Sequence, residues 1–212
     1  MHLNQENYQQ VLDHIIVKAK QDEIRPRVML HCCCAPCSSY VLEYLSPVFD
    51  VTGYFFNPNI FPEEEYLRRL KEFNKLFKRG NYTNNIFFME GEYNPKLFYH
   101  VASGYEQFME GQDRCLRCYA LRLLMTARVA KEMGYDYFST TLTVSPHKSA
   151  KDINQIGQMI SGITDIEWLP SDFKKRGGFI ESIELSKDYG LYRQSYCGCE
   201  YSFAERMSKH EE

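Results

Sequence analysis

The chain has 212 residues, with 25 Lys or Arg against 28 Asp or Glu, so its formal charge is −3. Hydrophobic residues make up 44% of the chain, which is ordinary for a protein that buries a core and argues against wholesale disorder. The mild net acidity excludes binding to nucleic acid through bulk charge, but it does not exclude binding through a local basic patch. No run of about 18 apolar residues is present, so we expect no membrane span.

Strand-like and helix-like segments alternate along the chain. This alternation predicts one α/β domain over residues 1–212, with a mostly parallel, Rossmann-like sheet flanked by helices. We expect helices over 8–19, 38–45, 62–79, 94–103, 150–160 and 179–189, and one more that Asp113 caps and Gly134 ends. The expected strands cover 27–31, 51–56, 86–89, 136–140 and 166–169, while 171–178 and 191–200 are expected to be loops.

Eight cysteines need a chemical reason. The polar N-terminal segment has neither an apolar leader nor a small-residue cleavage site, so we expect a cytoplasmic protein. Structural disulfides are disfavoured in that reducing compartment. Metal ligation, an iron–sulfur cluster or redox chemistry would each explain so many thiols there.

The first cysteine group, HCCCAPC at 31–37, lies between an expected strand and an expected helix. A helix N-terminus lowers thiol pKa values and favours the thiolate, which is the form that binds metal. Small buried hydrophobic residues are the structural alternative for this group.

Two further groups follow. Cys115 and Cys118 form a CxxC motif at a helix start, where we again expect thiolates, and the motif is compatible with zinc, cluster or redox use. Cys197 and Cys199 flank Gly198, and such a CxC pair can form a strained disulfide or supply metal ligands.

The number of cysteines bears on the metal. A closed zinc site needs four ligands, fewer than the thiols present. A [4Fe–4S] cluster needs four thiolates, which two cysteines of the first group and the CxxC pair can provide. That division leaves Cys37 and the CxC pair for chemistry.

The motifs HCCCAPCS, DRCLRCYALRL, STTLTVSPHK and GLYRQSYCGCEYS, in this order, resemble those of the QueH family of epoxyqueuosine reductases. The resemblance runs from about residue 27 to 203. It implies a Rossmann-like fold related to nucleotide α-hydrolases, and reduction of epoxyqueuosine to queuosine at the wobble position of tRNA, the last step of that modification. An SGGxDS-type phosphate loop is not seen after the first strand, so we do not predict ATP use.

The resemblance also implies roles for individual cysteines. Cys33, Cys34, Cys115 and Cys118 match the four ligands of a [4Fe–4S] cluster. Cys197 and Cys199 match a redox-active disulfide. Cys37 takes the place of an aspartate that in some members helps bind a second iron beside the cluster, so it is a candidate catalytic residue and ligand of an adjacent mononuclear iron. Cys32 precedes the family pair, and we assign it a structural role.

The remaining functional expectations concern protons, electrons and RNA. His31 and His147 are candidate proton donors, although hydrogen-bonded loop histidines are the favoured alternative. The implied partners are tRNA carrying epoxyqueuosine and an electron donor that the sequence does not identify. Residues 66–79 carry six positive charges against one negative, and 174–176 form a second basic cluster. Either can contact RNA phosphates, with a solvated helix face as the alternative for 66–79.

Two rival functions remain at this point. A cluster-dependent tRNA sulfur-transferase fits the fold and the cysteines but needs an ATP-binding loop. A zinc-stabilised nucleic-acid-binding module without catalysis also fits, and metal analysis distinguishes it from a reductase.

Overall fold

A computed structural model describes residues 7–80, 82–84 and 86–208. Its strands form one sheet in the order β3-β2-β1-β4-β5, and neighbouring strands are parallel throughout. Their bounds are Arg27–His31 (β1), Asp50–Phe55 (β2), Phe87–Glu90 (β3), Tyr137–Thr140 (β4) and Glu167–Trp168 (β5). The α/β, Rossmann-like class predicted from the sequence is therefore confirmed.

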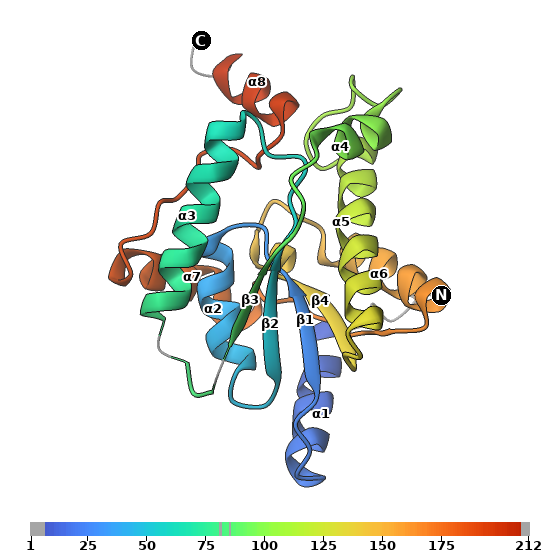
Figure 1. The fold of residues 1–212 in the computed structure, drawn as a ribbon, viewed down its shortest axis with the longest axis vertical. Helices are drawn as coiled ribbons and strands as arrows, with labels where there is room; N and C mark the ends of the chain where they lie inside the picture. The colour runs from blue at the N-terminus through green and yellow to red at the C-terminus, as the bar shows by residue number, and fades with distance from the viewer. Residues whose placement is uncertain (1–6, 81, 85, 209–212) are drawn as a thin grey trace.

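Helices cover both faces of the sheet (Figure 1). Their bounds are Tyr8–Gln21 (α1), Ala35–Leu45 (α2), Glu63–Arg79 (α3), Pro95–Ala102 (α4), Asp113–Glu132 (α5), Ala150–Thr164 (α6), Gly178–Asp188 (α7) and Glu200–Ser208 (α8). Helices α2, α3 and α7 pack on one face and α5 and α6 on the other. None of the helices within the described ranges is long and apolar enough to cross a bilayer.

The central strand β1 divides its side chains between the two cores. Val28 and Leu30 pack with α2 and α3, whereas Met29 packs with α5 and α6. All three are fully buried. Because successive side chains of a strand point to opposite faces, this run of apolar residues is what a strand covered on both sides requires.

The carboxyl ends of β1 and β4 lie side by side, because these strands pair in parallel from Val28 with Tyr137 to His31 with Thr140. The chain runs outward from β1 to β2 and β3 on one side, and the other side is built by β4 and β5. Such a reversal of strand order opens a crevice beyond the strand ends. There, the Cys33 amide donates to Thr141 Oγ1 at 3.2 Å.

Several boundaries differ from those expected. Helix α2 begins at Ala35, earlier than expected, and β5 has only two residues. Gly134, at φ +67°, follows the end of α5 as predicted. Asp113 is the first residue of that helix and Gln112 is the N-cap, so the capping role expected for Asp113 is wrong. Helix α8 was not predicted, because its single fully buried residue is Ser202 and it therefore lacks an apolar stripe.

Candidate metal and redox site

The first cysteine group lies at the N-terminus of α2, where Cys34 is the N-cap and Pro36 occupies the first turn. The Sγ atoms of Cys33 and Cys34 are 3.8 Å apart. The sulfurs of Cys33, Cys34 and Cys37 all lie within 4.8 Å of one another. This trio is a group of ligand atoms that could hold a metal ion.

The hydrogen bonds among Cys33, Cys34 and Cys37 favour a negative charge on one of the three sulfurs. Hydrogen bonds from Cys33 and then Cys37 hold the pKa of Cys34 well below its ordinary value. The hydrogen bond to Cys34 raises the pKa of Cys33, and hydrogen bonds to Cys33 and then to Cys34 raise the pKa of Cys37 well above its ordinary value. The thiolate expected at this helix N-terminus therefore forms first on Cys34, with two thiols donating to it.

Cys32 faces the other way. Its side chain is fully buried, and its Sγ donates to the carbonyl oxygen of Leu30 at 3.3 Å. It packs into the core with α2 and α3, and a Cβ placed on Gly53 would lie 3.3 Å from its sulfur. These contacts agree with the structural role expected for Cys32.

The CxxC pair is buried at the start of α5. Cys115 and Cys118 are each 7% exposed, and the amide of Gly111 donates to Cys115 Sγ at 3.2 Å. Burial raises the pKa of Cys115 and raises that of Cys118 to about 12. The lowered pKa values expected at this helix start are therefore not found, because desolvation of the thiolate exceeds the effect of the helix N-terminus.

The CxC pair belongs to the loop before α8. Gly198 lies between its cysteines at φ +147°, a conformation that other residues rarely adopt. Cys199 is buried with Cys118 and Phe98, whereas Cys197 is only partly buried and lines a cavity. Both cysteines are free thiols in this structure.

The structure thus places the CxxC pair near the CxC pair. Charges on Cys197 and Cys199 affect the pKa of both Cys115 and Cys118. Within the described part of the chain, Cys115 and Cys118 are not members of the tight sulfur group formed by Cys33, Cys34 and Cys37. Cys33 nevertheless packs at the edge of the core cluster that contains Cys115.

A buried arginine of α3 holds the CxC loop. Arg69 is 2% exposed, and it donates to the carbonyl oxygens of Cys197 at 2.9 Å and Tyr196 at 3.3 Å. Its Nε donates to Glu65 at 2.7 Å. The sequence interpretation counted Arg69 among charges available to RNA, and this is wrong because the guanidinium is enclosed by protein.

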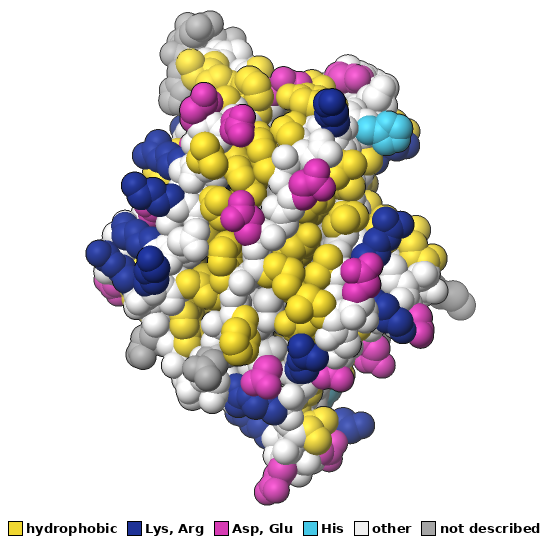
Figure 2. Space-filling model, viewed as in Figure 1, with side chains coloured by type: hydrophobic (Ala, Val, Ile, Leu, Met, Phe, Trp, Pro, Cys, Tyr) yellow, Lys and Arg dark blue, Asp and Glu magenta, His cyan; other side chains and the backbone are white. Residues whose placement is uncertain are grey.

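Other cations of the same helix also bind this segment. Lys75 donates to the carbonyl oxygen of Gly190, and Arg79 to that of Tyr189 at 3.5 Å. The exposed cations of α3 are Arg68, Lys71, Lys78 and Arg79. Figure 2 shows dark-blue side chains gathered on the side of the molecule that α3 occupies in Figure 1.

The second basic cluster is partly neutralised. Lys174 pairs with Asp172 at 2.8 Å, and Arg176 pairs with Asp13. Only Lys175 of the three is exposed and without an ion pair in the described structure. This pairing weakens the case for 174–176 as the main contact to RNA.

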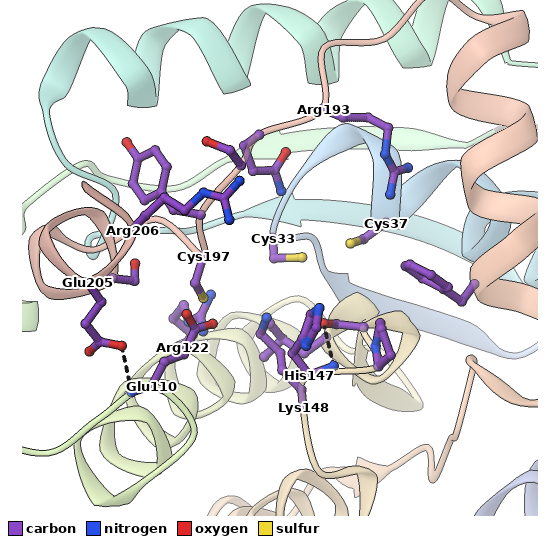
Figure 3. Close-up of a pocket in the computed structure, with 18 residues that line it drawn as sticks. Cys33, Cys37, Glu110, Arg122, His147, Lys148, Arg193, Cys197, Glu205 and Arg206 are labelled. Atoms are coloured by element: carbon purple, nitrogen blue, oxygen red, sulfur yellow. Dashed lines mark hydrogen bonds between the residues drawn. The ribbon is translucent and has the colours of Figure 1, made fainter. Parts of the chain in front are cut away.

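Two of the three cysteine groups meet at a cavity of about 560 Å³ (Figure 3). Sulfurs of Cys33, Cys37 and Cys197 line it, from the first and third groups. Four cations line it, Arg122, Lys148, Arg193 and Arg206, together with two acids, Glu110 and Glu205. Burial opposes the charge of Lys148, but negative charge on Cys197 and then on Tyr119 outweighs the burial and raises the pKa of Lys148. The cavity can therefore hold a polar ligand next to sulfur.

The two histidine candidates differ in placement. His31 is fully buried, with Nδ1 2.8 Å from Thr140 Oγ1 and Nε2 3.3 Å from the carbonyl oxygen of Phe56. Burial, assisted by Arg122, lowers the pKa of His31 to about 3. His31 is thus a neutral structural residue that donates from Nε2. His147 is exposed at the cavity wall.

Sequence reasoning missed Arg69, Arg122 and Lys148. Arg122 follows Cys118 by four residues, and Arg69 follows Glu65 by four, a spacing that places side chains on one face of a helix. That spacing was the available signal for the two arginines, of which only Arg69 entered the sequence interpretation, as a charge available to RNA.

Known proteins resemble this chain over most of its length. A profile of the family described as epoxyqueuosine reductase QueH matches residues 28–205. The chain is 42% identical over 203 residues to an epoxyqueuosine reductase QueH of Streptococcus pyogenes, covering 92% of this chain and 78% of the relative. It is 43% identical to that of Staphylococcus epidermidis (92% and 84% covered) and 37% identical to that of Thermotoga maritima (87% and 94% covered). The chain therefore belongs to the epoxyqueuosine reductase QueH family.

Proposed function

We propose that the protein is an epoxyqueuosine reductase, an oxidoreductase that converts epoxyqueuosine to queuosine at the wobble position of tRNA. The observation that carries this proposal is the arrangement of thiols from separate chain segments around one cavity, in a chain that matches the family profile over residues 28–205. We further infer that residues 1–212 form one domain, because the cavity takes its lining from β1 through α8. We place its activity in the cytoplasm, with its RNA substrate.

We assign Cys33, Cys34, Cys115 and Cys118 as ligands of a [4Fe–4S] cluster. Thiolates are the ligands that hold iron–sulfur clusters, and each of these four residues offers a sulfur atom as its donor. The residues also fit the charge of such a group, because the buried Nη2 of Arg122 has no hydrogen-bond partner. Cys37, which shares the tight sulfur group with Cys33 and Cys34, is the proposed ligand of an adjacent mononuclear iron.

The bound metals would supply single electrons and a Lewis acid for the epoxide oxygen. Conversion of an epoxide to an alkene consumes two electrons and two protons and releases water. Oxidation of the Cys197 and Cys199 dithiol to a disulfide yields two electrons and two protons, so this pair matches the stoichiometry. The external reductant that restores the dithiol is the unidentified electron donor.

The protein's own residues bind and orient the substrate. We propose that Lys148 and Gln194 at the cavity wall contact polar groups of the modified base, since the buried Oε1 of Gln194 has no hydrogen-bond partner among the described residues. We propose Arg68, Lys71 and Lys78 on α3 as contacts to the tRNA phosphates, which position the RNA without reading its sequence.

Anaerobic purification followed by iron and labile-sulfide analysis tests the metal assignment. We expect about four irons with sulfide for a cluster, and additional iron if Cys37 binds the second metal. Cys33→Ser and Cys115→Ser should lose the cluster absorbance, whereas the matched control Cys32→Ala should keep it. A colourless chain that contains only zinc would contradict the reductase and favour a zinc-stabilised module. Reduction of epoxyqueuosine-containing tRNA by the loaded enzyme then tests the activity.

A further inference from the structure

Arg122 is a buried cation at the cavity wall. It lies four residues after Cys118 on α5, so the two side chains share a helix face. Its side chain is 2% exposed. Nε donates to the Cys118 carbonyl oxygen at 3.3 Å and Nη1 to Asn57 Oδ1 at 3.4 Å. Nη2 has no hydrogen-bond partner in the described structure, although it is buried.

The charge of Arg122 is not balanced by an acid. Two other arginines of the described chain are equally buried, and each is paired: Arg69 with Glu65 at 2.7 Å and Arg114 with Glu205 at 3.0 Å. Arg122 forms no ion pair with a described carboxylate. An unpaired buried charge is costly, so its presence calls for a negative charge nearby.

Sulfur is the available source of that charge. Cys33 and Cys197 line the same cavity as Arg122, and Arg122 Nε donates to the carbonyl oxygen of Cys118. These three cysteines come from the three separate cysteine groups. Figure 3 places the Arg122 side chain beside Cys197, on the same cavity as Cys33.

We infer that Arg122 is a positioning residue that supplies the counter-charge for the thiolate ligands of the metal centre. Its fixed positive charge stabilises the deprotonated sulfurs, so it strengthens metal binding and makes reduction of the centre easier. This inference rests on the metal centre proposed above and extends it to a residue outside the ligand set.

The test compares Arg122→Met, which removes the charge but keeps much of the volume, with Arg122→Lys, which keeps the charge. For Arg122→Met, we expect iron affinity in a chelator competition to fall by about tenfold to a hundredfold, and the midpoint potential of the centre to become more negative. Arg122→Lys should keep much of the wild-type iron affinity and of the wild-type midpoint potential. If Arg122→Met does not fold, Arg122→Gln replaces it in the comparison with Arg122→Lys.

Thermal stability separates this role from packing. Without metal, Arg122→Met should be at least as stable as the wild-type chain, because an unpaired charge has been removed; with iron it should be less stable. The control Arg114→Met breaks a charge pair at equal burial and should lower stability in both states. Equal iron affinity and equal midpoint potential in Arg122→Met and wild type would overturn the inference about Arg122 but not the proposed metal centre. A wild-type chain that binds no iron would overturn the proposed centre and the inference together.

Discussion

The guanidinium of Arg69 donates a 2.9 Å hydrogen bond to the carbonyl oxygen of Cys197, joining α3 to the CxC pair across 128 residues of sequence. A Cβ on the neighbouring Gly198 would lie 3.1 Å from Arg69 Nη1, so loop and arginine are in close contact. The amide of Phe61 adds a second attachment, a 2.8 Å hydrogen bond to Gly198 O. The position of Cys197 at the cavity is therefore set by α3 together with Phe61, just before that helix.

Removal of the Arg69 side chain should release this loop. We expect Arg69→Met to destabilise the protein by about 3–5 kcal/mol, because Glu65 is left buried without its partner. Alkylation of Cys197 should become faster, as measured by mass spectrometry of iodoacetamide-treated protein. Lys71→Met, an exposed change on the same helix, is the control and should leave both measurements near wild type. Unchanged alkylation in Arg69→Met would contradict the anchoring role.

The CxC pair can be tested by its dependence on the reductant. If the pair transfers electrons to the reaction, Cys197→Ser should lower multiple-turnover activity with a thiol-dependent donor by about tenfold or more, about 1.4 kcal/mol on the barrier. A strong chemical reductant that reaches the metal centre directly should restore activity. Wild-type rates with both reductants would rule out the relay. Cys32→Ala is the matched control, since Cys32 lies in the core away from the cavity.

The buried His31 predicts a pH dependence of stability. Its folded pKa of about 3 lies below the ordinary value of 6.5, so the unfolded chain binds more protons between these values. The stability contributed by neutral His31 is complete above pH 6.5 and declines as the pH falls toward 3, by up to about 1.4 kcal/mol per pH unit.

Urea denaturation of His31→Gln between about pH 4 and 7 measures that contribution. We expect a shallower decline than in wild type, because the titrating ring has been removed. His147→Gln, at the exposed cavity wall, should decline in parallel with wild type. A parallel decline in both variants would show that His31 does not carry the effect.

Two charge-matched double variants distinguish the proposed RNA surfaces. Lys71→Ala with Lys78→Ala removes exposed cations from α3, and we expect weaker tRNA binding with a salt slope reduced by about one for each lost phosphate contact. Lys174→Ala with Arg176→Ala removes cations that are paired with acids, so we expect a smaller change. Filter binding of tRNA at several salt concentrations measures both, and a larger effect of the second variant would reverse the assignment.

Local patterns predicted the sheet well, because a strand covered on both faces leaves an unbroken apolar run. Residues 27–31 were expected as a strand, and β1 has those bounds. Periodicity gave no sign of α8, whose one fully buried residue is Ser202. The cysteine groups were visible in the sequence, but the cations among them were not, because burial of Arg69 and Arg122 depends on segments distant in sequence.

The long separation between Arg69 and Cys197 has a consequence for synthesis of the chain. Cys33, Cys34, Cys115 and Cys118 all precede the CxC loop, and so do the strands of the described sheet. A nascent chain can therefore complete its sheet before Cys197 leaves the ribosome. The proposed cluster ligands would then be open to metal delivery from one side, and docking of the last segment onto α3 would close the site as the final step of assembly.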